Sequence, residues 1–126
     1  MENRRLGAAE RLKSSSAIQH LYRQGKTIQK GPLRIVYLPL TQGEQSAAAF
    51  IAPKRSFRRA VDRNRIKRQL REAYRLNRHL LSPLDVPVRV LFVYRGREMT
   101  RSSRIFRSME SVLNQIVQDE ESAPEV

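Results

Sequence analysis

The chain has 126 residues, with 25 lysines and arginines against 12 aspartates and glutamates, and a formal net charge of +13. This length suits a single domain, and the excess positive charge favours a polyanionic partner such as nucleic acid. Cysteine is absent, which excludes disulfide frameworks and thiolate metal sites. Because no secretory signal or membrane span of roughly 20 apolar residues is visible, we expect a cytoplasmic protein without a membrane partner.

The first half of the chain predicts a helix followed by strands. A run of serines at 14–16 can cap a short helix that stops at Gly25. The segment GKTIQKGP predicts a turn with a brief strand. Residues 33–40 (LRIVYLPL) predict a strand because β-branched and aromatic residues dominate them. Residues 46–53 (SAAAFIAP) follow the loop TQGEQ, so we expect these two strands to pair as a hairpin, although the alanines of the second also suit a helix.

The middle of the chain predicts a long basic helix and then a strong strand. Apolar residues recur at helical spacing from Ile66 to Leu81, which predicts a helix over roughly 58–80. The breakers in SPLDVP end it, and residues 88–94 (VRVLFVY) give the strongest strand signal, expected at the centre of the sheet. If this strand runs parallel to the preceding one, the general rule predicts a right-handed crossover through the helix.

A third helix closes the predicted domain. Residues 105–117 trace one apolar face, and Ser102 or Ser103 can cap the start. The acidic end predicts disorder, so we expect one domain over residues 1–118 and a disordered acidic tail over 119–126. Helix, two or three strands, helix, strand, helix is an α+β fold: a small mixed sheet of about four strands with helices covering it.

The basic helix places its charge opposite its apolar stripe. Residues 54–79 sum to +9, whereas residues 108–126 sum to −5. Helical geometry puts a polar set opposite Ile66 and Leu70: Asn64, Arg68, Arg71 and Arg75, flanked by Arg65, Lys67 and Arg78. Like charges three or four residues apart destabilise an isolated helix by about 0.2–0.5 kcal/mol per pair. Nucleic-acid phosphates would neutralise this face, and arginine can bind them with forked hydrogen bonds.

Other interpretations of the helix are a solvated face in a basic protein, or a helix lying on a membrane surface. The second requires a free apolar face, which a small core needs for itself. The chain offers little chemistry of its own, since His20 and His79 fall on different helices and the carboxylates are scattered. We therefore predict a binding protein with no catalytic and no metal-ligating residues.

The stretch AVDRNRIKRQLREAYR resembles the protein subunit of bacterial ribonuclease P, whose hallmark is an Arg-Asn-Arg helix. RLKSSSAIQHLYRQGKTI and LRIVYLPL are similar to that family's opening segment and first long strand, so the resemblance spans about residues 11–118. It implies the order α-β-β-β-α-β-α with three helices and a left-handed crossover, against the general rule. It also implies a subunit that binds a catalytic RNA and helps to remove the 5′ leader of precursor tRNA.

The resemblance and the surrounding basic run assign two RNA-binding surfaces. The catalytic RNA is expected on Lys54, Arg55, Arg58, Arg59, Arg63, Asn64, Arg65, Lys67, Arg68, Arg71 and Arg75. The single-stranded leader is expected in a cleft between the first helix and the sheet, at Ile18, Tyr22 and Tyr37. Ile18 stands where the family often has phenylalanine. Ser56 and Phe57 stand where a valine-glycine pair is usual, which can change the turn before the helix.

The resemblance also implies where the chemistry lies. The RNA subunit performs the phosphodiester hydrolysis and holds the Mg²⁺, so no protein ligand for the metal and no obligate protein partner are expected. The runner-up function is a structural RNA-binding protein of the ribosomal type with no processing role, and the third is a protein that is itself a nuclease.

Overall fold

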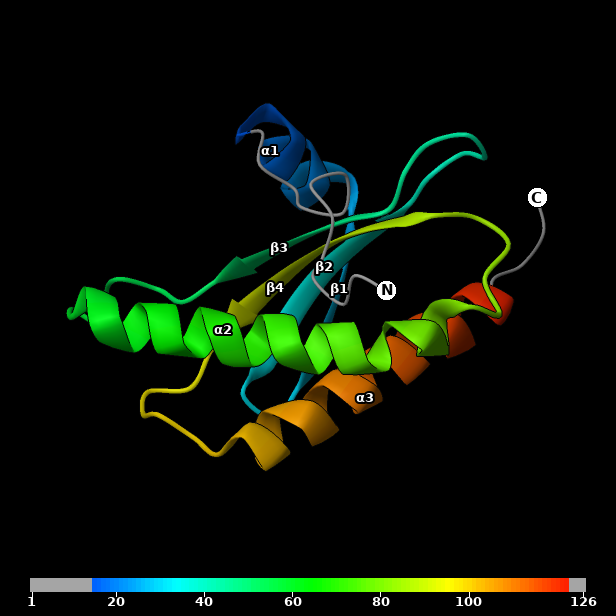
Figure 1. The fold of residues 1–126 in the computed structure, drawn as a ribbon. Helices are drawn as coiled ribbons and strands as arrows, with labels where there is room; N and C mark the ends of the chain where they lie inside the picture. Colours follow the sequence, from blue (N-terminus) through cyan, green and yellow to red (C-terminus); the bar gives the residue numbers. More distant parts are fainter. Residues whose placement is uncertain (1–14, 123–126) are drawn as a thin grey trace, which may run out of the picture.

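The computed structural model describes residues 15–122 (Figure 1). Its elements are α1 (Ser15–Gln24), β1 (Lys26–Lys30), β2 (Leu33–Pro39), β3 (Ala47–Ile51), α2 (Ala60–Asn77), the short 3₁₀ helix η2 (Arg78–Leu81), β4 (Val88–Tyr94) and α3 (Ser102–Glu121). This is the predicted α+β order, with the brief strand before residue 33 present as β1. Ser14 of the proposed serine cap lies outside the described residues.

The sheet has the strand order β1-β2-β4-β3, so β4 is central, as predicted. β1 pairs antiparallel with β2 across a tight turn at Gly31, whose φ of 55° favours glycine. β2 pairs antiparallel with β4, and β3 pairs parallel with β4. The predicted hairpin between residues 33–40 and 46–53 is therefore wrong, because β4 lies between these strands and the loop that joins them lies beside the start of β4.

The connection from β3 through α2 to β4 is a parallel βαβ unit. Figure 1 shows α2 in front of the sheet and both strands running in the same direction. When this view is turned so that the strands point upward, β4 lies to the left of β3 (Figure 1). The crossover is thus left-handed, as the family resemblance implies, and the expectation from the general right-handed rule is wrong for this chain.

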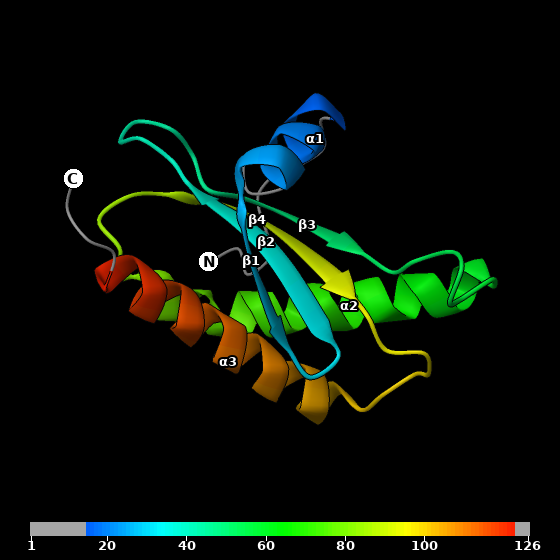
Figure 2. The same ribbon diagram turned by 180° about the vertical axis from the view of Figure 1, so that it is seen from behind.

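Helices cover both faces of the sheet. α2 and α3 pack on one face, where side chains such as Leu33, Ile35 and Phe92 form the main core with Ile66 and Leu70 of α2. α1 packs on the other face, which Figure 2 shows from its own side. A smaller cluster there joins α1 to β2, β3 and β4: Leu21, Val36, Ala49, Leu91 and Val93.

The start of α3 differs from its prediction. α3 begins at Ser102, and its N-cap residue is Arg101, which makes no side-chain capping hydrogen bond. The prediction that Ser102 or Ser103 caps the helix is wrong, because both serines lie inside its first turn.

The end of α3 also differs. α3 continues to Glu121, so residues 119–121 are helical and not part of a disordered tail. The Tyr37 hydroxyl donates a 2.9 Å hydrogen bond to Glu120 Oε2, and Lys26 Nζ lies 2.6 Å from the same oxygen. Burial, followed by the contact with Glu120, raises the pKa of Tyr37. Residues 123–126 lie outside the described part of the chain.

Candidate nucleic-acid interface

α2 presents a cationic face because its opposite face is held in the core. Ile66 and Leu70 have no exposed surface and pack between the sheet and α3. Burying a side chain of this size stabilises the fold by about 1.5–3 kcal/mol. This packing fixes the rotation of the helix about its axis, so the arginines on the other side must face solvent. We call Arg65, Arg68 and Arg71, all exposed, the arginine ridge.

Within the described residues, no ion pair neutralises the charges of the arginine ridge. In the described part of the chain, the ion pair on α2 joins Arg75 to Glu72, with Arg75 Nε donating a 3.0 Å hydrogen bond to Glu72 Oε2. This contact lowers the pKa of Glu72 and raises that of Arg75. No carboxylate of residues 15–122 pairs with the ridge. Three cations therefore lie one helical turn apart without a partner, which is unfavourable until an anion binds.

The turn before α2 is closed by its unusual phenylalanine. The Phe57 amide donates a 3.1 Å hydrogen bond to the Pro53 carbonyl, and the Phe57 side chain is buried against Tyr94, with ring centroids 5.7 Å apart. Ser56 and Phe57 thus form a turn that is anchored in the core. Four predicted cations flank it and are exposed: Lys54, Arg55, Arg58 and Arg59.

Three predicted RNA-binding residues in the first half of α2 differ in their exposure and in their contacts with the protein. Arg63 Nη1 donates 2.8 Å hydrogen bonds to the carbonyls of Phe57 and Arg58, so this half-buried side chain holds the turn against the helix. Asn64 is exposed and Lys67 is half-buried. Arg63 therefore positions the neighbouring cations, while Asn64 can reach a ligand directly.

The structure does not bring the three predicted leader-binding residues together. Ile18 packs against the smaller cluster beneath α1, and Tyr22 of the same helix is 53% exposed. Tyr37 has no exposed surface and lies on the opposite face of the sheet, in the main core. The assignment of Tyr37 to a cleft beside α1 is wrong, because Val36 is the β2 residue whose side chain belongs to the α1 cluster.

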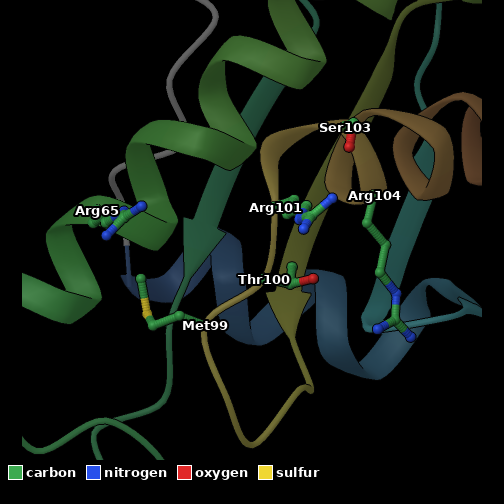
Figure 3. A pocket seen from close by; sticks show the side chains of 6 residues that line it. All are labelled: Arg65, Met99, Thr100, Arg101, Ser103 and Arg104. Atoms are coloured by element: carbon green, nitrogen blue, oxygen red, sulfur yellow. The ribbon is translucent and has the colours of Figure 1, made fainter.

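A basic region that the predicted sites omit lies beside the ridge. Residues 95–107 contain five arginines and one acid, Glu98, a signal that was visible in the sequence. A hollow of about 410 Å³ separates α2 from the start of α3. Its lining joins one residue of the arginine ridge to this basic region (Figure 3): Arg65, Met99, Thr100, Arg101, Ser103 and Arg104.

The two histidines lie apart in the fold. His20 is on α1 and His79 is on η2, on opposite sides of the sheet. Within residues 15–122 no group of three or more histidines, cysteines, aspartates or glutamates is placed to hold a metal ion. The helices of that same part of the chain are also too short or too polar to cross a membrane.

Comparison with known proteins identifies the family. A family model described as Ribonuclease P matches residues 6–117. The chain belongs to the ribonuclease P protein family. A ribonuclease P protein component from Porphyromonas gingivalis is 35% identical over 120 residues, covering 88% of this chain and 85% of that protein. One from Chlorobaculum tepidum is 35% identical over 105 residues, covering 73% and 68%.

Solved structures of ribonuclease P proteins share the fold. The Staphylococcus aureus RNase P protein superposes with a TM-score of 0.71 at 21% identity, covering 85% of this chain and 94% of that one. The Thermotoga maritima protein gives a TM-score of 0.70 at 17% identity, covering 84% and 96%. The resemblance seen in the sequence is thereby confirmed, and so is the mixed α+β fold.

Proposed function

We propose that the chain is the protein subunit of ribonuclease P, which binds the catalytic RNA through α2 and assists removal of the 5′ leader from precursor tRNA. Membership of the family supports the subunit role. The observation that carries the RNA-binding surface is that the arginine ridge (Arg65, Arg68 and Arg71) forms no ion pair with any carboxylate of residues 15–122. Because precursor tRNA is made in the cytoplasm of bacteria, the proposal also places the chain there.

The arginine ridge suits an RNA backbone better than an isolated anion. Its members are three residues apart, about 4.5 Å along the helix axis, so they form a row. The exposed cations before the helix extend this row by way of Arg58 and Arg59. A row of guanidinium groups can fork onto successive phosphates, and each bound phosphate releases counterions.

The leader of precursor tRNA is proposed to lie against α1. Tyr22 supports this placement, because it is a largely exposed aromatic side chain next to an apolar cluster. Stacking of a base on an aromatic ring is worth about 1–3 kcal/mol and tolerates any sequence, as a variable leader requires. Ile18, which is partly buried, can supply only apolar contact there.

We assign the chemical step, and the Mg²⁺ that it needs, to the RNA. The side chains present support this assignment, because the two histidines occupy opposite sides of the sheet and the acids are dispersed. The protein then contributes binding and positioning. Its own cations would stabilise the folded RNA and hold the substrate near the RNA's active centre.

Reconstitution tests the function. Precursor tRNA with Mg²⁺ is incubated with the protein alone, with the ribonuclease P RNA from the same genome alone, and with both, at moderate salt and low Mg²⁺. We expect efficient release of the leader only with both. Cleavage by the protein alone would identify a nuclease, and no stimulation of the RNA would leave a structural RNA-binding protein.

The salt dependence of binding tests the surface. If about six phosphates are neutralised, affinity for the RNA subunit should fall on the order of a thousandfold between about 50 and 200 mM salt. The measurement is a filter-binding or fluorescence titration at several salt concentrations. An affinity that does not respond to salt would contradict the arginine ridge as the docking surface.

Tyr22→Ala tests the leader surface. We expect it to leave assembly with the RNA subunit unchanged and to weaken binding of precursor tRNA by about tenfold, with no effect on mature tRNA. The matched control is Tyr22→Phe, which keeps the ring and should bind normally. Equal losses for both tRNAs would show that Tyr22 does not contact the leader.

A further inference from the structure

We propose that the hollow between α2 and the start of α3 binds one backbone phosphate of the RNA that lies on the arginine ridge. The RNA would then continue from α2 onto the N-terminal end of α3. This inference rests on the proposed RNA-binding function and extends it to residues outside the predicted interface. Its site is the lining of the hollow, chiefly Arg65, Arg101 and Arg104 (Figure 3).

The lining of the hollow has the composition of an anion site. Three of its six residues are arginines, two carry hydroxyl groups, Thr100 and Ser103, and none is acidic. Arg65 comes from α2, whereas Arg101 and Arg104 come from the start of α3, so two elements bring like charges to the lining of one hollow. Within residues 15–122 no ion pair neutralises any of the three. An anion in the hollow would relieve this repulsion.

The direction of α3 gives independent support. The N-terminal end of a helix is positive, so acids are favoured there and cations are disfavoured. α3 has no acid in its first turn, carries Arg104 in that turn and Arg101 at its N-cap, and has no side-chain capping hydrogen bond. The helix N-terminus and the arginines that line the hollow therefore both favour an anion near the start of α3.

The hollow is formed before any ligand binds, because its rim is tied to α2. Gln69 Nε2 donates 3.1 Å hydrogen bonds to the Thr100 carbonyl and to Ser102 Oγ. The Tyr94 hydroxyl donates a 2.5 Å hydrogen bond to the Glu98 carbonyl and closes the loop from β4. Binding would thus cost little ordering of the backbone, which favours affinity.

A neighbouring hollow indicates where the RNA continues. It has a volume of about 410 Å³ and is lined by Arg95, Arg97 and Arg104, among others. The two hollows share Met99, Thr100 and Arg104. Arg104 thus stands between them, and a strand that fills the first hollow can pass toward the second. This continuity with the arginine ridge favours a nucleic-acid backbone over a small free anion or an acidic peptide.

A double-mutant cycle on binding to the ribonuclease P RNA tests the proposal. We expect Arg65→Ala and Arg101→Ala each to weaken binding about tenfold. If both arginines hold one phosphate, the double variant should lose much less than a hundredfold in affinity, which is the product of the two single losses. Arg68→Ala with Arg101→Ala is the matched pair. This double variant should lose about a hundredfold in affinity, because the two arginines bind different phosphates.

Salt dependence and a control arginine complete the experiment. Arg101→Ala with Arg104→Ala should reduce the slope of log affinity against log salt by about 0.7–0.9, the loss of one phosphate contact. Arg107→Ala, an exposed arginine of α3 that does not line the hollow, should change affinity less than twofold. Melting followed by circular dichroism checks that each variant folds.

The outcomes separate this inference from the proposed function. If Arg68→Ala weakens binding but Arg101→Ala and Arg104→Ala together do not, the arginine ridge binds RNA and the hollow does not. Equal losses for Arg107→Ala and Arg101→Ala would mean diffuse attraction and would overturn the phosphate site. If the wild-type protein does not bind the RNA, both proposals fail.

Discussion

α2 and α3 lie side by side on one face of the sheet, and both bury an apolar stripe. They differ in whether their charged side chains find partners within the protein. Glu120, near the end of α3, accepts hydrogen bonds from Tyr37 and Lys26 of the same chain. By contrast, the arginines of the ridge and those at the start of α3 form no ion pair with any acid of residues 15–122. Glu72 and Glu98 stand near these cations, yet neither forms an ion pair with them. The lack of internal partners within residues 15–122 indicates that the cations serve a partner and not the fold.

Replacing the whole arginine ridge should have the largest effect on RNA binding. The triple substitution Arg65→Ala, Arg68→Ala and Arg71→Ala should weaken binding to the ribonuclease P RNA about a thousandfold, or about 4 kcal/mol. The melting temperature should stay constant or rise, because three repelling charges are removed. The matched triple lysine variant keeps the charge but cannot make the forked hydrogen bonds of arginine, so its affinity for the RNA should fall only about tenfold. A large fall in melting temperature would show that the ridge stabilises the fold.

The acidic end of α3 should behave in the opposite way. Glu120→Ala removes the acceptor of a buried hydroxyl and the partner of Lys26, so we expect the free energy of unfolding to fall by about 1–3 kcal/mol. Affinity for the RNA should change less than twofold. Chemical denaturation and a binding titration measure the two quantities on one sample. Asp119→Ala is the control: this exposed neighbour accepts a hydrogen bond from Gln115 on the same helix, so stability should change by no more than about 0.2–0.5 kcal/mol.

The same contact makes stability sensitive to alkaline pH. Burial, the hydrogen bond to Glu120 and nearby acids raise the pKa of Tyr37 in the folded state, while an unfolded tyrosine titrates at about pH 10. The stabilisation is therefore complete below about pH 10 and decreases as the pH rises above it. Tyr94, whose pKa is raised mainly by burial, acts in the same direction.

Tyr37→Phe measures the share of Tyr37 in that loss. Melting temperatures between pH 8 and 12 should fall less steeply for this variant than for the wild type, with Tyr94 accounting for what remains. Parallel curves for the two proteins would contradict the assignment of the alkaline transition to the contact between Tyr37 and Glu120.

Sequence patterns predicted most of the elements but not how the strands pair. The limits of α2 and β4 followed from local periodicity, since an amphipathic helix and an apolar strand show in neighbouring residues. The pairing of β3 with β4 is non-local, and nothing in residues 46–53 distinguishes β2 from β4 as a neighbour. The left-handed crossover likewise followed from the family resemblance and not from the general rule.

The misplacement of Tyr37 has a related physical reason. β2 is covered by helices on both faces, so Leu33, Ile35, Val36 and Tyr37 are all buried. A strand that is apolar on both sides does not show which of its residues faces which layer. The cationic face of α2 could be predicted because its other side alone is apolar. The arginines beside α3 were missed because they are divided between a loop and a helix end.

The smallest effect concerns Glu72, the acid of α2 that forms the ion pair with Arg75. Glu72 pairs with Arg75 on an exposed surface, so Glu72→Gln should change the free energy of unfolding by only about 0.2–0.5 kcal/mol. The substitution also releases Arg75 and removes a negative charge beside the arginine ridge. Affinity for the RNA should therefore rise about two- to fivefold at low salt, and this gain should decrease as salt screens the charges. Glu110→Gln, an exposed acid of α3 outside the hollow, is the control and should give a smaller gain. An equal gain from both variants would mean that only net charge matters, whereas a larger gain from Glu72→Gln would locate the RNA along α2.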